Sequence, residues 1–68
     1  MKYYTKPVPS DMAILYETYT TKEILDEYFP EWAAMMAITN QPITEEQCIE
    51  DWVLMNHAWE SDSEGYHV

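Results

Sequence analysis

Residues 44–60, TEEQCIEDWVLMNHAWE, have the apolar spacing of an amphipathic helix. Thr44 followed by Gln47 fits a capping box, and Glu45 and Glu46 place negative charge where a helix N-terminus favours it. At 3.6 residues per turn, one side of this helix is apolar, comprising Cys48, Ile49, Trp52, Val53, Met55 and Trp59. The opposite side is polar and comprises Glu46, Glu50, Asp51 and His57, with Leu54 as the main exception. The pattern therefore predicts a helix with two tryptophans on its apolar side and carboxylates on its back.

A second helix is predicted over residues 22–38, because Thr20 and Glu23 form a T-x-x-E capping pattern in front of another apolar stripe. The stripe comprises Ile24, Leu25, Tyr28, Phe29, Trp32, Met35 and Met36. Pro30 removes one helical hydrogen bond, but it lies on the polar side and the stripe continues through it in phase. We predict a single kinked helix, with two short helices as the alternative.

The first twenty residues allow two interpretations. Pro7 and Pro9 favour an extended arm over residues 1–9. Ser10 can cap a helix that starts at Asp11, yet the run AILYETYT also resembles a strand that would pair with MKYYT as a hairpin. The predicted fold is a single all-α domain over residues 1–68, with three helices, the extended arm and a flexible tail over residues 61–68. The alternative is an α+β fold with an N-terminal hairpin and two helices.

Charge is the most unusual property of the chain. Thirteen acidic residues oppose three lysines and no arginine, for a net charge of −10. All three lysines precede residue 23, and the eleven acidic residues from Glu23 onward have no basic residue among them. This sign excludes direct binding to nucleic acid or to an anionic membrane surface. With no secretory signal and no apolar run long enough to span a bilayer, the expected location is the cytoplasm.

Enzymatic chemistry is not expected. One glycine cannot build a phosphate-binding loop, and Cys48 and His57 point to different sides of the same predicted helix. Cys48 is interpreted as a small buried apolar residue. His57 and Glu60 are too few ligands for a specific metal site, so we expect neither a metal nor another cofactor.

The candidate binding site is the acidic side of the two longer predicted helices. Carboxylates at i and i+4 lie about 6 Å apart along a helix, which is close to the through-space separation of successive phosphates on a DNA strand. The like-charged pairs are unfavourable and no lysine relieves them, whereas a merely solvated helix usually alternates charge signs. The candidate partner-binding residues are Glu23, Asp26, Glu27, Glu31, Glu45, Glu46, Glu50 and Asp51.

In its small size, lack of arginine, one-sided acidic helices and many aromatic residues, the chain resembles the small acidic inhibitors encoded by bacteriophages. That group includes DNA-mimic antirestriction proteins, anti-CRISPR proteins and uracil-DNA glycosylase inhibitors. The resemblance covers the character of the whole chain and no sequence motif. It implies a stoichiometric inhibitor that occupies the basic cleft of a host nucleic-acid-binding or defence protein in the host cytoplasm. The alternative is a small acidic homodimer or adaptor that uses the Trp- and Met-rich sides of its helices.

Overall fold

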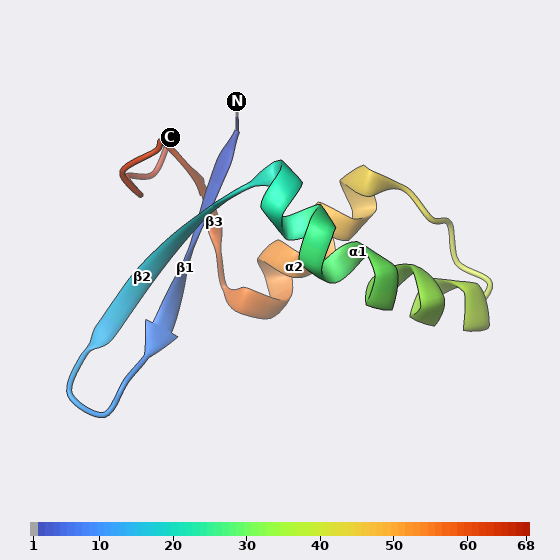
Figure 1. Ribbon diagram of the computed structural model, residues 1–68, viewed down its shortest axis with the longest axis horizontal. Helices are drawn as coiled ribbons and strands as arrows, with labels where there is room; N and C mark the ends of the chain where they lie inside the picture. The colour runs from blue at the N-terminus through green and yellow to red at the C-terminus, as the bar shows by residue number, and fades with distance from the viewer. Residues whose placement is uncertain (1) are drawn as a thin grey trace.

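The computed structural model describes residues 2–68 and shows an α+β fold (Figure 1). Its elements are β1 (Tyr3–Pro9), β2 (Ile14–Thr20), α1 (Thr21–Ile38), α2 (Glu45–Asn56) and β3 (Trp59–Ser61). The strands form an antiparallel sheet in the order β2-β1-β3, and the two helices pack against each other beside it. The all-α prediction with three helices is therefore wrong, and the alternative with an N-terminal hairpin and two helices fits.

Residues 10–20 account for the wrong fold class. Ser10 closes the hairpin turn instead of capping a helix: its hydroxyl donates to the Ala13 carbonyl (2.6 Å) and accepts from the Ala13 N–H (3.2 Å). A serine side chain satisfies backbone groups equally well in a turn and at a helix N-cap, so Ser10 did not distinguish the two. The β-branched and aromatic residues that follow Ala13 favour the strand, which gains a full ladder against β1.

The N-terminal segment is the central strand of the sheet. Its register against β2 runs from Tyr3 opposite Thr20 to Pro9 opposite Ile14, while β3 pairs only with residues 3–5. The distal half of the hairpin therefore projects beyond the helices (Figure 1). Near its base, the Tyr19 ring contacts the Trp52 ring of α2 edge-on at 5.5 Å, so this face of the sheet packs on the helices.

Helix α1 begins at the predicted capping box, in which Glu23 N–H donates to the Thr20 hydroxyl (3.2 Å) and Thr20 N–H donates to the Glu23 carboxylate (2.9 Å). The helix runs through Pro30 to Ile38 as one element. Pro30 is exposed, so the carbonyl that it leaves without a helical partner is on the water side. The prediction of a single helix across the proline is confirmed.

Helix α2 also begins where predicted, with the Thr44 hydroxyl accepting from Gln47 N–H (3.1 Å), but it ends four residues earlier than residue 60. His57 adopts the left-handed conformation (φ 53°). Its N–H bonds to the Leu54 carbonyl and the Ala58 N–H bonds to the Val53 carbonyl, which is the Schellman pattern of a helix end. Trp59 is consequently in β3, not on the apolar side of the helix as predicted.

The core lies between the helices and the base of the sheet. It is centred on Ile24 of α1 and on Ile49 and Trp52 of α2, and Trp32 and Cys48 are completely buried nearby. Burial raises the pKa of the Cys48 thiol, with the nearby carboxylates of Asp51 and Glu45 adding to the shift. Cys48 is therefore a protonated, inaccessible thiol that packs as a small apolar residue.

The chain after β3 folds back over the face of the sheet opposite the helices. Trp59 Nε1 donates to the Gly65 carbonyl (3.2 Å), and Ser61 forms an isolated bridge with His67. Gly65 has φ 93°, a backbone conformation that favours glycine, and a Cβ there would lie close to the Thr18 hydroxyl, at 3.3 Å. The flexibility of residues 61–68 stays a prediction. Within residues 2–68, neither helix has the length and apolar character needed to cross a membrane.

Candidate functional site: the acidic helix surface

The eight candidate carboxylates differ in their exposure and in their hydrogen-bond partners. Seven of the eight residues are exposed and Asp51 is half-buried. Two of them, Glu23 and Asp51, accept hydrogen bonds that hold the fold together. The remaining six have neither an ion pair nor a side-chain hydrogen bond within residues 2–68, and they are Asp26, Glu27, Glu31, Glu45, Glu46 and Glu50.

Asp51 connects the two helices. One of its oxygens accepts from the indole N–H of Trp32 (2.7 Å), and the other accepts from the side-chain amide of Gln47 (3.0 Å). Because Trp32 is completely buried, Asp51 supplies the only hydrogen-bond partner of that indole among the described residues. Gln47 is thereby drawn away from the reciprocal capping bond that the sequence pattern suggested. Asp51 is therefore primarily a structural residue, although the sequence grouped it with the binding carboxylates.

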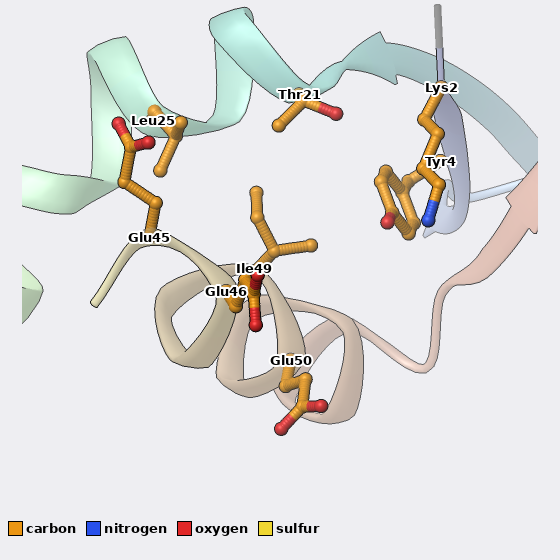
Figure 2. A pocket seen from close by; sticks show the side chains of 8 residues that line it. All are labelled: Lys2, Tyr4, Thr21, Leu25, Glu45, Glu46, Ile49 and Glu50. Atoms are coloured by element: carbon orange, nitrogen blue, oxygen red, sulfur yellow. The ribbon is translucent and has the colours of Figure 1, made fainter.

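Three of the unpaired carboxylates border one open groove at the N-terminal ends of the helices. The groove has a volume of about 410 Å³ and is lined by Lys2, Tyr4, Thr21, Leu25, Glu45, Glu46, Ile49 and Glu50. Figure 2 shows Glu45 reaching toward Leu25, Ile49 pointing from α2 toward α1, and Glu50 pointing away from α1. Asp26 and Glu45 together line an adjoining hollow. The groove thus has an apolar floor and a rim of carboxylates.

The other acidic residues of α1 lie along a different flank of the helix. Glu23 and Glu27 are close enough to Tyr19 of β2 to contribute to the raised pKa of its phenol, and Glu31 acts similarly on Tyr28. We therefore distinguish a groove group (Asp26, Glu45, Glu46 and Glu50) from a flank group (Glu23, Glu27 and Glu31) on α1.

Two features of this surface were not found from the sequence. Lys2 and Tyr4 line the groove because β1 is the central strand, and the sequence was interpreted as an arm there. The Lys2 ammonium lies 3.6 Å from the Glu60 carboxylate, which is the only ion pair among residues 2–68. Lys6 is also engaged, since its ammonium lies over the rings of Tyr19 (5.7 Å) and Trp52 (5.9 Å). The alternation of residue types along the hairpin could have predicted the positions of Lys2, Tyr4 and Lys6.

The raised pKa of Tyr19 predicts how the stability of the protein changes at alkaline pH. Its hydroxyl donates to Glu17 Oε1 at 2.6 Å, and this bond, followed by burial and by the charges of Glu17, Glu27 and Glu23, raises the pKa of Tyr19 to about 12. Between pH 10 and pH 12 the folded state therefore keeps this proton while the unfolded phenol loses it. The contribution to stability is complete below pH 10 and is lost as the pH rises toward 12.

We expect Glu17→Gln to lower the pKa of Tyr19 and to reduce this alkaline loss of stability. The measurement is an NMR titration of the Tyr19 ring carbons in both proteins, together with urea unfolding at pH 9 and pH 11. An unchanged Tyr19 titration in Glu17→Gln would show that the Glu17 bond is not the main cause.

The structure does not bring Cys48 and His57 together. Cys48 is buried, whereas His57 is exposed at the end of the same helix. Among residues 2–68, no three His, Cys, Asp or Glu side chains are placed to hold a metal ion. What the surface offers chemically is negative charge around an apolar groove.

Comparison of the chain with protein-family models, with curated proteins and with solved structures finds no match.

Proposed function

We propose that this protein is a non-enzymatic inhibitor of the phage type, which occupies a cationic site of a nucleic-acid-processing or defence protein in place of nucleic acid. The observation that carries the proposal is that most of the helix carboxylates are exposed and lack a partner. Residues 21–57 contain eight carboxylates and one lysine, and six of those carboxylates are exposed without any partner within residues 2–68. Such an arrangement attracts a positively charged surface over a long range.

The groove supports a more specific form of contact. Its floor of Tyr4, Leu25 and Ile49 fits the aliphatic stem of a lysine or arginine, and its rim of Glu45, Glu46 and Glu50 fits the charged head. Proteins that grip nucleic acid present such side chains toward the phosphates. The groove group would thus engage the cations that normally contact the phosphate backbone.

The adaptor alternative receives less support. Trp32 and Trp52 are buried in the protein's own core, so these side chains are not available to a partner. A substitution of Trp52 would disrupt the fold and would not test binding. The exposed apolar side chains left to this alternative on the helices are Met35, Ile38, Leu54 and Met55, and others lie in the hairpin.

The test is capture from a bacterial lysate by the immobilised protein at low salt, followed by a salt step and identification of the eluted proteins by mass. We expect nucleic-acid-binding proteins, retained at low salt, released by the salt step and displaced by added duplex DNA. Both effects follow because the contact is electrostatic and the partner's site is the one that holds nucleic acid.

Two matched double variants control for net charge, since each changes it from −10 to −8. Glu46→Gln/Glu50→Gln alters the groove rim, and Asp11→Asn/Glu64→Gln alters exposed carboxylates outside the helices. We expect the first to lose the captured partner and the second to retain it. Capture that is insensitive to both DNA and the groove variant would contradict the proposal.

A further inference from the structure

The outer edge of β2 has unpaired backbone groups. Tyr16 lies opposite Pro7 and Ile14 lies opposite Pro9. Because proline has no N–H, these are non-hydrogen-bonded pairs of the antiparallel ladder, so the N–H and C=O groups of Ile14, Tyr16 and, by alternation, Thr18 point away from β1. No strand of residues 2–68 lies beyond β2.

This edge has little of the usual protection against pairing, since Glu17 is its only charged residue. On the other side of the hairpin, the same alternation turns the donorless nitrogens of Pro7 and Pro9 outward, and β3 covers residues 3–5. By contrast, β2 contains neither proline nor lysine, and Ile14, Leu15 and Tyr16 are 59%, 57% and 63% exposed. A regular, exposed, apolar edge of this kind is a template for another strand.

The distribution of charge indicates what that strand is. Residues 2–20 carry Lys2, Lys6, Asp11 and Glu17 and are electrically neutral, whereas residues 21–68 carry the whole net charge of −10. Two copies of the protein repel each other everywhere except through the hairpin. We propose that β2 pairs with β2 of a second copy, antiparallel about a two-fold axis, so that the two sheets become continuous.

The side chains select one register for this pairing. Because outward backbone groups belong to even-numbered residues, a symmetric ladder is centred on Leu15, Tyr16 or Glu17. Centring on Glu17 opposes two carboxylates directly, which is unfavourable, and centring on Leu15 leaves Thr18 unpaired within the strands. Centring on Tyr16 pairs residues 14–18, with Ile14 opposite Thr18 and Leu15 opposite Glu17 of the second copy.

The dimer also has a consequence for the acidic surface. A two-fold axis relating neighbouring antiparallel strands is perpendicular to the sheet, so both pairs of helices lie on the same side of the combined sheet. The dimer would therefore present a longer acidic surface than one copy. The inference itself rests on the strand edge and does not depend on the proposed function.

The test is the mass of the purified full chain by sedimentation equilibrium, from micromolar to about 1 mM protein. We expect dimerisation that strengthens with added salt, because salt screens the repulsion between the acidic helices. This sign is opposite to that expected for binding of a cationic partner, so failure of one proposal is distinguishable from failure of the other. A monomer at all protein and salt concentrations would overturn the dimer. The edge of β2 would then be left to pair with a strand of another protein.

Three variants locate the interface. Tyr16→Pro removes an outward N–H that has no partner in β1, and we expect it to abolish dimerisation while circular dichroism remains that of the wild type. Leu15→Glu sets a carboxylate opposite Glu17 of the second copy, and Leu15→Lys sets an ammonium there. We expect about 10-fold weaker dimerisation for Leu15→Glu and equal or tighter dimerisation for Leu15→Lys at low salt.

If Tyr16→Pro fails to fold, the variants Leu15→Glu and Leu15→Lys still test the interface. Leu15 is exposed, and its two replacements are charged residues of opposite sign. Equal effects of Leu15→Lys and Leu15→Glu would overturn the proposed register. A folded Tyr16→Pro variant that still dimerises would overturn the β2 interface altogether.

Discussion

Replacement of Trp32 by alanine is expected to remove most of the free energy of unfolding of the protein at 25 °C. Trp32 is 0% exposed and lies where α1 meets α2, against the Phe29 ring at 5.7 Å. Truncating a buried tryptophan costs about 3–5 kcal/mol. A domain of 68 residues buries only about 60% of the surface that its unfolded chain exposes, so its stability lies near the lower end of the usual range of about 5–15 kcal/mol. The measurement is urea unfolding followed by far-UV circular dichroism.

The Trp32–Asp51 hydrogen bond is measured separately by a double-mutant cycle. Asp51→Ala leaves the buried indole N–H without a partner, which costs about 1–3 kcal/mol. In a Trp32→Phe background that N–H is absent, so we expect Asp51→Ala to cost markedly less there. Equal costs in the two backgrounds would show that the bond contributes nothing to stability, and Asp51 would rejoin the binding carboxylates.

Neutralising the groove rim is expected to change stability and binding in opposite directions. Glu46 and Glu50 are a like-charged i, i+4 pair on α2, and neither has a partner within residues 2–68. Glu46→Gln/Glu50→Gln should therefore raise the free energy of unfolding at low salt, by about 0.2–0.5 kcal/mol for the pair itself. The same variant should bind the captured partner about 10-fold or more weakly, mainly through slower association.

The control is again Asp11→Asn/Glu64→Gln, whose two positions are far apart in the sequence and outside the helices. We expect this control to leave both stability and affinity close to those of the wild type. Unfolding in urea and stopped-flow association with the captured partner measure the two quantities. If the groove variant gains stability and keeps its affinity, the carboxylates serve solubility alone.

The sequence by itself determined both helices. Each begins at a threonine whose hydroxyl accepts from the N–H three residues later, and such local bonds depend only on neighbouring residues. The apolar stripe of α1 also follows from local spacing, and Ile24 and Trp32 on it are buried as expected. The exposure of the acidic side could be predicted for the same reason, since charged side chains require water unless they are paired.

Only the tertiary structure decided the first twenty residues, the end of α2 and the layout of the candidate site. Ser10 and the apolar run after it suit a turn and strand as well as a helix, and the choice depends on a ladder with β1. Trp59 leaves the helix because β3 pairs with residues 3–5, more than fifty positions away in the chain. Asp51 accepts from Trp32, nineteen positions away, and Lys2 reaches the groove because β1 is the central strand, and neither contact follows from the local spacing of apolar residues on a helix.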